Sequence, residues 1–398
     1  MSRRARWRSA DHQEPSRGAG TCRRLGAFCG IRADRPIVHR VSEARPSPSD
    51  RHHRQVILPG FGPEAQERLR SSHALVVGCG ALGCAAADLL ARAGVGTLTL
   101  VDRDVVEPTN LQRQTLFCEA DALDGAPKAE AAKRRLQAID SSLRVHACVE
   151  HVSADNACEL VRDCDVVVDG LDSYVTRYLL NDAAVRLGKP FVHAGAVGFR
   201  GTSMPILAGV ASALGIAPAD APCLRCVFPD PPPPGSGETC DTAGVFGPLV
   251  ATVGAHAAAQ SLALLAGLPA LLDRSLWSTD LRAHRTVRVP LAGSARADCP
   301  CCAGRRFEFL DAGDDGRCAV LCGRNAVQVR PARAASIDLA RLRERLSSAG
   351  EFTIADGRLV GSLGGGLELT AFGDGRAIVR GTTDPVAALA AYARYVGE

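Results

Sequence analysis

The sequence predicts an α/β fold with a Rossmann-like, doubly wound and mostly parallel sheet, together with a small C-terminal α+β appendage. The first observation is an apolar run from Ala74 that leads into the glycine-rich turn Gly78-x-Gly80-x-x-Gly83. The second is the order of the next segments: a helix-spaced stretch, the apolar strand Thr97–Val101 and then Asp102. A strand, glycine turn, helix, strand and acid in this order form a βαβ unit. Its right-handed crossover puts the glycine turn at the carboxyl edge of the sheet.

Alternating helical and strand patterns continue after Asp102. We expect helices over Lys128–Ile139 and residues 156–161, and strands over residues 144–149, Val166–Asp169 and 286–290. From Pro205 to the proline run at 231–234 the sequence is rich in Pro and Gly, which is typical of a long crossing loop.

Three parts are expected along the chain. Residues 1–48 are rich in Arg, Ser and Pro and are predicted to be a disordered extension. The alternatives are an Arg-rich amphipathic transit segment and a start codon assigned too far upstream. Residues 49–304 form the large α/β part, and residues 305–398 form a separate small α+β domain. In this last part we expect a strand over 318–329, a helix over 337–346 capped by Ser336, a hairpin turning at Asp374 and Gly375, and a final helix beginning at Asp384-Pro385.

Composition narrows the classes of function. The chain has 398 residues and a net charge of only +4, with much of the Arg excess in the first fifty residues, which argues against a nucleic-acid partner. Sixteen cysteines without a secretory signal indicate thiols and metal ligands in the cytoplasm. The apolar run 249–268 contains His256 and Gln260, so we expect a buried helix and no membrane span.

The glycine turn predicts a nucleotide site, because backbone N–H groups at a helix N-terminus bind phosphate and Asp102 is placed to accept a ribose hydroxyl. The alternative is a tight structural turn, and the motif alone does not separate NAD from ATP. Arg113 and Lys128 favour ATP, since cleavage between the α- and β-phosphates puts charge on oxygens that fixed cations stabilise. For either cation alone, a solvated surface position is the competing interpretation.

Four segments then share one resemblance. Arg51-His-His-Arg-Gln-Val-Ile-Leu58, Gly78-Cys-Gly-Ala-Leu-Gly83, Asn110-Leu-Gln-Arg-Gln114 and Gly125-Ala-Pro-Lys128 resemble, in order and spacing, the signatures of the ThiF/MoeB/ubiquitin-activating superfamily. The resemblance covers about residues 51–302. It implies an adenylyltransferase that uses ATP to activate the C-terminal glycine carboxylate of a small ubiquitin-like sulfur-carrier protein.

The resemblance also implies roles for single residues. Asp102 would hold the ribose, Asp172 a magnesium ion, and Arg54 would reach the active site of the other subunit in a homodimer. The remaining nucleotide contacts would come from the glycine turn, the Asn110 segment and the two loops near it: Gly78, Gly80, Ala81, Gly83, Asn110, Arg113, Gln114, Lys128 and Ser173. Two departures affect the finer contacts, because the family often has Gly where this chain has Ala81 and Asn where it has Ser173.

Two cysteine pairs, Cys223-x-x-Cys226 and Cys299-x-x-Cys302, have the spacing of a tetrahedral zinc site. The alternative is free reduced thiols, and Cys301 leaves the fourth ligand ambiguous by one residue. The resemblance implies that this zinc fastens the crossing loop to the end of the domain.

Cys240 follows the proline run, where family members carry a cysteine implicated in thioester or acyl-disulfide chemistry. Its neighbour Asp241 does not favour a thiolate, so an ordinary loop cysteine is the alternative. His193 and His256 are expected to be packing or loop histidines.

The expected mechanism needs no general base, since a carboxylate is already a nucleophile. Magnesium on Asp172, with Arg54, Arg113 and Lys128, would overcome the repulsion between carboxylate and α-phosphate. The alternatives are an activator that keeps its carrier as a thioester on Cys240, and a non-catalytic nucleotide-binding scaffold. No rhodanese-like segment is evident after Cys302, so a separate sulfur-donor protein is expected. Thiamine, molybdopterin and tRNA thiolation all remain open as the pathway.

Overall fold

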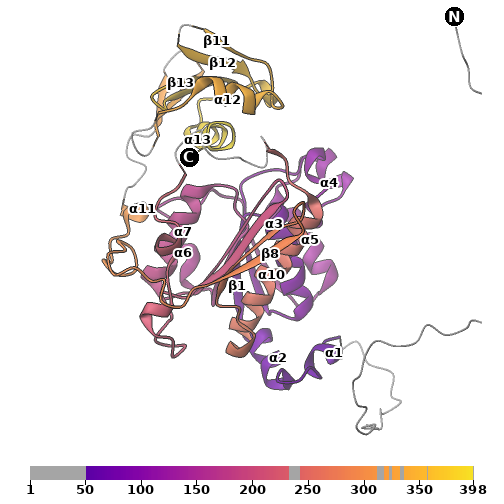
Figure 1. Cartoon of the computed structure of the whole chain (residues 1–398). Coiled ribbons are helices and arrows are strands. Elements are labelled where there is room, and N and C mark those ends of the chain that lie inside the picture. The colour runs from indigo at the N-terminus through magenta and orange to yellow at the C-terminus, as the bar shows by residue number, and fades with distance from the viewer. Residues whose placement is uncertain are drawn as a thin grey trace, which may run out of the picture. The chain divides into compact units, whose positions relative to one another are not determined.

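The computed structural model describes residues 51–232, 243–311, 318–321, 325–331, 336–355 and 357–397. These residues form two β-sheets, each covered by helices of its own (Figure 1). The predicted N-terminal extension and Cys240 lie outside the described residues.

The larger sheet has eight strands in the order β3-β2-β1-β4-β5-β6-β7-β8. The first five are parallel and the last three continue the sheet in antiparallel pairing, which confirms the predicted α/β class. Val77 at the end of β1 lies level with Val101 and Asp169 on its two neighbours, so three carboxyl ends meet at one edge. The strands are β1 His73–Val77, β2 Thr97–Val101, β3 Arg144–Cys148, β4 Val166–Asp169, β5 Phe191–Val197, β6 Arg200–Ile206, β7 Ser275–Asp280 and β8 Arg285–Pro290.

Helices cover both faces of this sheet because the central strands are apolar on both sides. In β1, Ala74 and Val76 join one buried cluster, whereas Leu75 and Val77 join another. The first cluster lies under α3 (Ala81–Ala93), α5 (Lys128–Ile139) and α10 (Gly247–Leu265); the second lies under α6 (Ala157–Arg162) and α7 (Tyr174–Leu187). The shorter helices are α1 His53–Val56, α2 Gly62–Ser71, α4 Glu119–Leu123, α8 Leu224–Val227 and α11 Glu308–Asp311.

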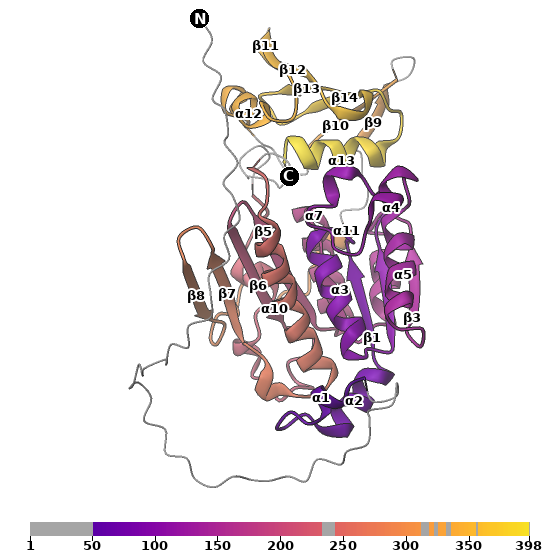
Figure 2. The same ribbon diagram turned by 90° about the vertical axis from the view of Figure 1, so that its right-hand side faces the viewer.

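Helix α10 is long and apolar enough, by length and composition, to cross a membrane. It instead packs beside α3 against the sheet (Figure 2). Gly254 allows this close approach, because a Cβ added there would lie 2.6 Å from the Cβ of Ala85. The predicted buried helix is therefore present, and it ends at Leu265.

The smaller sheet is antiparallel, with strand order β11-β12-β13-β14-β10-β9. Its buried side chains, among them Leu342, Leu369 and Tyr392, form a core of their own with α12 and α13. The prediction of three parts along the chain is consistent with this separate core and stays a prediction. The elements are β9 Cys318–Leu321, β10 Ala326–Val329, α12 Leu339–Leu346, β11 Phe352–Ala355, β12 Arg358–Ser362, β13 Glu368–Phe372, β14 Ala377–Arg380 and α13 Pro385–Tyr395.

Two expectations for this region were wrong. The single strand over 318–329 is two antiparallel strands, β9 and β10, with Leu321 opposite Ala326. Helix α12 is capped not by Ser336 but by Asp338, whose Oδ1 accepts from the N–H groups of Ala340 (2.9 Å) and Arg341 (3.2 Å). The expected cap of the last helix is confirmed, since Asp384 Oδ1 accepts from Val386 N–H at 2.9 Å.

Candidate nucleotide and metal sites

The glycine turn after β1 is packed backbone against backbone. A Cβ on Gly83 would lie 1.8 Å from the carbonyl oxygen of Gly78, and one on Gly78 would lie 2.6 Å from that of Gly170. Gly78 also has a φ of +88°, which L-residues rarely adopt. The turn between β1 and α3 therefore fits against the turn after β4 only because these positions carry no side chain.

Gly80 differs from its neighbours because the space beside it is open. A Cβ added there would meet only the Gly170 carbonyl oxygen, at 3.6 Å, which is ordinary contact. Gly80 is the N-cap of the 13-residue α3, and no side chain caps this helix end in the described part of the chain. The first N–H groups from Ala81 onward are thus available at the positive end of a helix, an arrangement that binds phosphate.

Two carboxylates and a lysine lie at the end of β2. Asp102 accepts hydrogen bonds from the N–H groups of Cys79 (2.7 Å) and Asp104 (2.8 Å), and burial raises its pKa. Lys128, only 8% exposed, places Nζ 3.1 Å from Asp104 Oδ2. Burial lowers the pKa of Lys128, but Asp102 and Asp104 outweigh it and the pKa is raised. Lys128 is therefore a cation fixed beside the glycine turn.

The turn that carries Asn110 is held by its own side chains. Asn110 Oδ1 accepts from Glu107 N–H at 3.0 Å, and Arg113 Nη1 donates to Thr109 O at 2.9 Å. Arg113 thus folds onto its own turn, and no contact with Lys128 is seen among the described residues. Gln114 is 4% exposed, and its Oε1 has no hydrogen-bond partner within the same residues. A buried hydrogen-bond acceptor without a partner is consistent with a site that binds a polar ligand.

Asp172 and Ser173 follow β4 at the same edge of the sheet. Ser173 caps α7 by accepting from Thr176 N–H at 3.3 Å, and Asp172 is exposed just before it. Asp172 also contributes to the raised pKa of Lys128, although less than Asp102 and Asp104 do. An exposed carboxylate is a suitable ligand for Mg²⁺. Gly80, Asp102 and Asp172 follow the level ends of β1, β2 and β4, and Lys128 binds Asp104 beside them, so the four residues lie at one edge of the sheet and their roles stay predictions.

Arg54 does not join them in its own chain. It is exposed on α1, whose neighbouring Gln55 donates to the carbonyl oxygen of Ala93, the last residue of α3 (2.9 Å). The glycine turn lies at the other end of that helix, roughly 20 Å away at 1.5 Å per residue (Figure 2). Arg54 therefore lies too far from the glycine turn of its own chain to contact it.

The four predicted cysteines converge. Their sulfur atoms lie within 4.8 Å of one another, with 3.9 Å between Cys223 and Cys226, 3.5 Å between Cys223 and Cys299, and 3.4 Å between Cys226 and Cys302. Tetrahedral Zn–S bonds of about 2.3 Å require sulfur separations of about 3.8 Å, so the donor set fits zinc. Cys301 stands outside this group of four and accepts a hydrogen bond from Asn181 Nδ2 at 3.3 Å.

Arg225, between the first two cysteines, was not among the residues predicted from sequence. It is 4% exposed, and only its Nη2 has a hydrogen-bond partner in the described structure, Glu308 Oε2 at 2.9 Å. Zinc with four thiolates carries a net charge of about −2, and a buried cation beside it compensates that charge. A polar residue inside a Cys-x-x-Cys turn is the signal that could have indicated this position.

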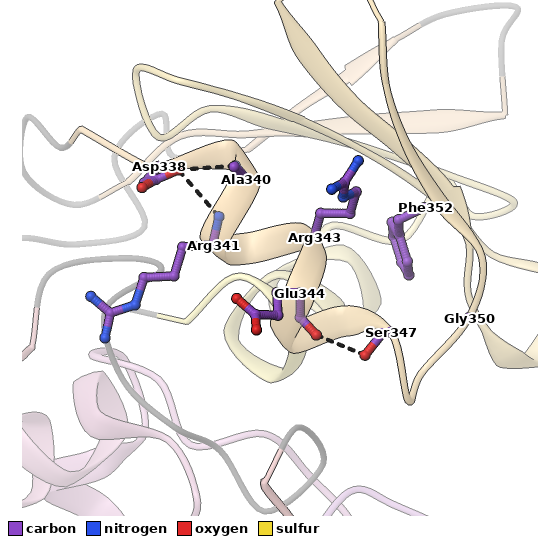
Figure 3. A pocket seen from close by; sticks show the side chains of 8 residues that line it. All are labelled: Asp338, Ala340, Arg341, Arg343, Glu344, Ser347, Gly350 and Phe352. Carbon is purple, nitrogen blue, oxygen red and sulfur yellow. Dashed lines mark hydrogen bonds between the residues drawn. The ribbon is translucent and has the colours of Figure 1, made fainter.

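A groove of about 810 Å³ lies on the C-terminal sheet, over α12. Figure 3 shows Arg341, Arg343 and Glu344 along it. The hydrogen bonds drawn there are the Asp338 cap and the bond from Ser347 Oγ to Glu344 O (2.7 Å), which both terminate the helix itself. These contacts belong to the two ends of α12 and do not indicate a ligand site.

Fold and site together define a Rossmann-like protein with a lysine and two aspartates beside the glycine turn. The model of the ThiF family matches residues 52–301 of this chain. The chain belongs to the ThiF family, and like its relatives it is an adenylyltransferase.

Two relatives and one solved structure illustrate the similarity. The sulfur carrier protein ThiS adenylyltransferase of Bacillus subtilis is 38% identical over 351 residues, which cover 87% of this chain and 99% of that protein. An alignment of this length extends beyond residue 305. The sulfur carrier protein adenylyltransferase of Thermus thermophilus is 43% identical over 256 residues, 61% of this chain and 90% of that protein. The Escherichia coli MccB structure with MccA-N7isoASN has the same fold (TM-score 0.54, 23% identity, covering 65% of this chain and 75% of that one).

Proposed function

We propose that this enzyme uses ATP to adenylylate the C-terminal carboxylate of a ubiquitin-like sulfur-carrier protein. The observation that carries the proposal is the convergence of the uncapped start of α3, Lys128 and Asp172 at one edge of a ThiF-family sheet. The named activities of the relatives support the same substrate class.

The residues at this edge suit the charges of the reaction. The start of α3 at Gly80 would bind phosphate oxygens, and Asp102 would accept a ribose hydroxyl. Lys128 and Arg113 would stabilise the charge that develops as pyrophosphate leaves. Asp172 would hold Mg²⁺, which supplies further neutralisation of the phosphates. The raised pKa of Lys128 supports its role, because the side chain stays charged at neutral pH.

We also propose a homodimer that completes the site with Arg54 of the other copy. Helix α10 exposes small residues at helical spacing, Ala251, Ala255 and Ala259, beside the exposed Leu89 of α3. Small side chains let two helices approach closely. A two-fold axis on this face perpendicular to α3 would run the two α3 helices antiparallel, so the α1 end of one copy would meet the glycine turn of the other.

Three finer proposals accompany this function. The cluster of Cys223, Cys226, Cys299 and Cys302 would hold structural zinc, as its sulfur separations support. A separate protein would donate sulfur after activation. The cytoplasm is the expected compartment, since a cluster of unpaired thiols suits a reducing environment.

The test is carrier-dependent ATP–pyrophosphate exchange with a ThiS-type carrier protein. We expect Lys128→Ala and Arg113→Ala each to lower the exchange rate about a hundredfold or more, the usual effect of removing one fixed donor from a site of developing charge. Arg135→Ala, which removes an exposed cation from the same helix as Lys128, is the matched control and should exchange normally. Near-normal exchange by both site variants would defeat the assignment.

A further inference from the structure

Three buried polar residues that the proposed mechanism does not use lie beneath the loop that carries Asp172. Asp169 ends β4, Arg177 lies on α7 and His193 lies on β5. Their side chains are 0%, 6% and 6% exposed. Buried charges of this kind are costly unless every donor and acceptor is paired.

The hydrogen bonds of these residues join the Asp169 carboxylate to two backbone positions, Leu171 and Ala194. At Ala194, on β5, the N–H donates to Asp169 Oδ2 at 3.4 Å and the carbonyl oxygen accepts from Arg177 Nη2 at 3.2 Å. Asp169 Oδ2 accepts from Arg177 Nε at 2.5 Å and from His193 Nδ1 at 2.9 Å. Asp169 Oδ1 accepts from the N–H of Leu171 at 3.0 Å, and Arg177 Nη2 donates to the carbonyl oxygen of Leu171 at 2.7 Å. The ion pair therefore holds Leu171 by both of its backbone polar groups.

The residue held in place through Leu171 is Asp172. It lies between the clamped Leu171 and Ser173, which is fixed as the N-cap of α7. Arg177 gains further rigidity from Tyr174, whose ring centroid lies 5.3 Å from the guanidinium carbon. With both flanking residues anchored, the exposed carboxylate of Asp172 has little freedom to move away from the sheet edge.

Stability alone does not require this network. Well-packed apolar residues often replace a buried ion pair without loss of stability. Apolar residues could not, however, bind the N–H and the carbonyl oxygen of Leu171 at once. The charged pair thus holds two backbone positions, Ala194 on β5 and Leu171, and its contacts with Leu171 are the ones directed at the Asp172 loop.

We propose that Asp169 and Arg177 are positioning residues that fix Asp172 for the metal–ATP complex, with His193 orienting the Asp169 carboxylate. This inference rests on the proposed function, because it takes Asp172 as the metal ligand. The proposal adds to the site buried residues that would contact neither the nucleotide nor the carrier protein.

The test measures binding of Mn²⁺ in the presence of ATP by electron paramagnetic resonance, which needs no turnover. We expect Asp169→Asn and Arg177→Lys to weaken Mn²⁺ binding about tenfold or more. Asn keeps the shape of Asp169 without its charge. Lys keeps the charge of Arg177 but has one nitrogen in place of the two, Nε and Nη2, that bind Asp169 and Leu171. The matched control is Asp182→Asn, a fully buried acid on the same helix that accepts from Phe309 N–H (3.0 Å) away from the loop. This control should bind Mn²⁺ like the wild type even if its thermal midpoint falls.

Three results would overturn the inference: unchanged Mn²⁺ binding by both variants, equal weakening by Asp182→Asn, or no Mn²⁺ binding by the wild type with ATP. Hydrogen exchange on the wild type gives a check that needs no variant, since the Leu171 amide should be protected and free exchange there would also refute the clamp. A wild type that binds Mn²⁺ and ATP but never exchanges pyrophosphate would refute the proposed function instead. In that case the Mn²⁺ binding of the variants would still test whether Asp169 and Arg177 position Asp172.

Discussion

Replacing Gly83 with alanine should lower the stability of the folded protein, whereas the same change at Gly80 should weaken only ATP binding. At Gly83 the new Cβ would lie 1.8 Å from the Gly78 carbonyl oxygen, and both atoms belong to packed backbone. Relieving the overlap means moving the turn by more than about 1 Å in a region that the Gly170 backbone also fills. Overpacking of this kind costs about 3 kcal/mol or more, which should lower the thermal midpoint by roughly 5 °C or more.

At Gly80 the magnitudes differ because the added methyl group meets only ordinary contact at 3.6 Å, with φ at −72°. The gain from a less flexible unfolded chain, about 0.4–1 kcal/mol, is offset by the poorer N-cap, so stability should stay within about 1 kcal/mol of the wild type. The methyl group would however occupy the approach to the α3 N-terminus. We expect ATP affinity to fall at least tenfold, about 1.4 kcal/mol.

Differential scanning fluorimetry and calorimetric titration with ATP measure the two quantities on the same preparations. A Gly83→Ala protein as stable as the wild type would refute the packing argument. Normal ATP affinity in Gly80→Ala would refute the assignment of the α3 N-terminus as the phosphate site.

Three further outcomes are expected. Cys226→Ser should lose bound zinc in metal analysis and unfold at lower temperature, while Cys158→Ser, which alters a thiol outside the cluster, should keep its zinc; equal zinc in both would contradict the site. Ala255→Arg should shift the protein from dimer to monomer in light scattering and lose exchange activity with it, and a variant that remains dimeric would exclude the α10 face as the contact. Cys240→Ala should retain pyrophosphate exchange but lose any thiol-sensitive covalent adduct with the carrier. If the wild type forms no such adduct in non-reducing mass spectrometry, Cys240 is an ordinary loop cysteine.

The parallel half of the large sheet was predictable from sequence because its signals are local. Strands β2 and β4 and helix α5 have the predicted bounds, since each is an uninterrupted apolar or amphipathic run ended by a polar residue. Strands β5 to β7 were not assigned. In β6 the sequence includes Pro205, and β5 carries His193 within its apolar run, so tertiary pairing rather than local pattern defines these strands.

The candidate site likewise contains some residues that the sequence predicted and others that it did not. Gly80 and Asp102 were predicted because they follow strand ends at motif spacing, Lys128 because it ends the Gly125-Ala-Pro-Lys128 motif at the start of α5, and the four cysteines because ligand spacing is regular. The partners of Asp169 could not be found, since Arg177 and His193 lie 8 and 24 residues away and meet it only through the strand order. His256 was expected to be a packing or loop histidine, and its ring indeed stacks on Trp277 with centroids 4.6 Å apart.

The cysteine cluster joins two points of the chain that are 76 residues apart, between Cys223 and Cys299. A metal bound there would close a ring around α10, β7 and β8, much as a disulfide does, and closing a ring of that size removes roughly 4.5 kcal/mol of unfolded-state entropy. Unlike a disulfide, this cross-link would survive in a reducing compartment. Its strength would vary with the concentration of free zinc, so the supply of one trace element would set how long the folded enzyme persists in the cell.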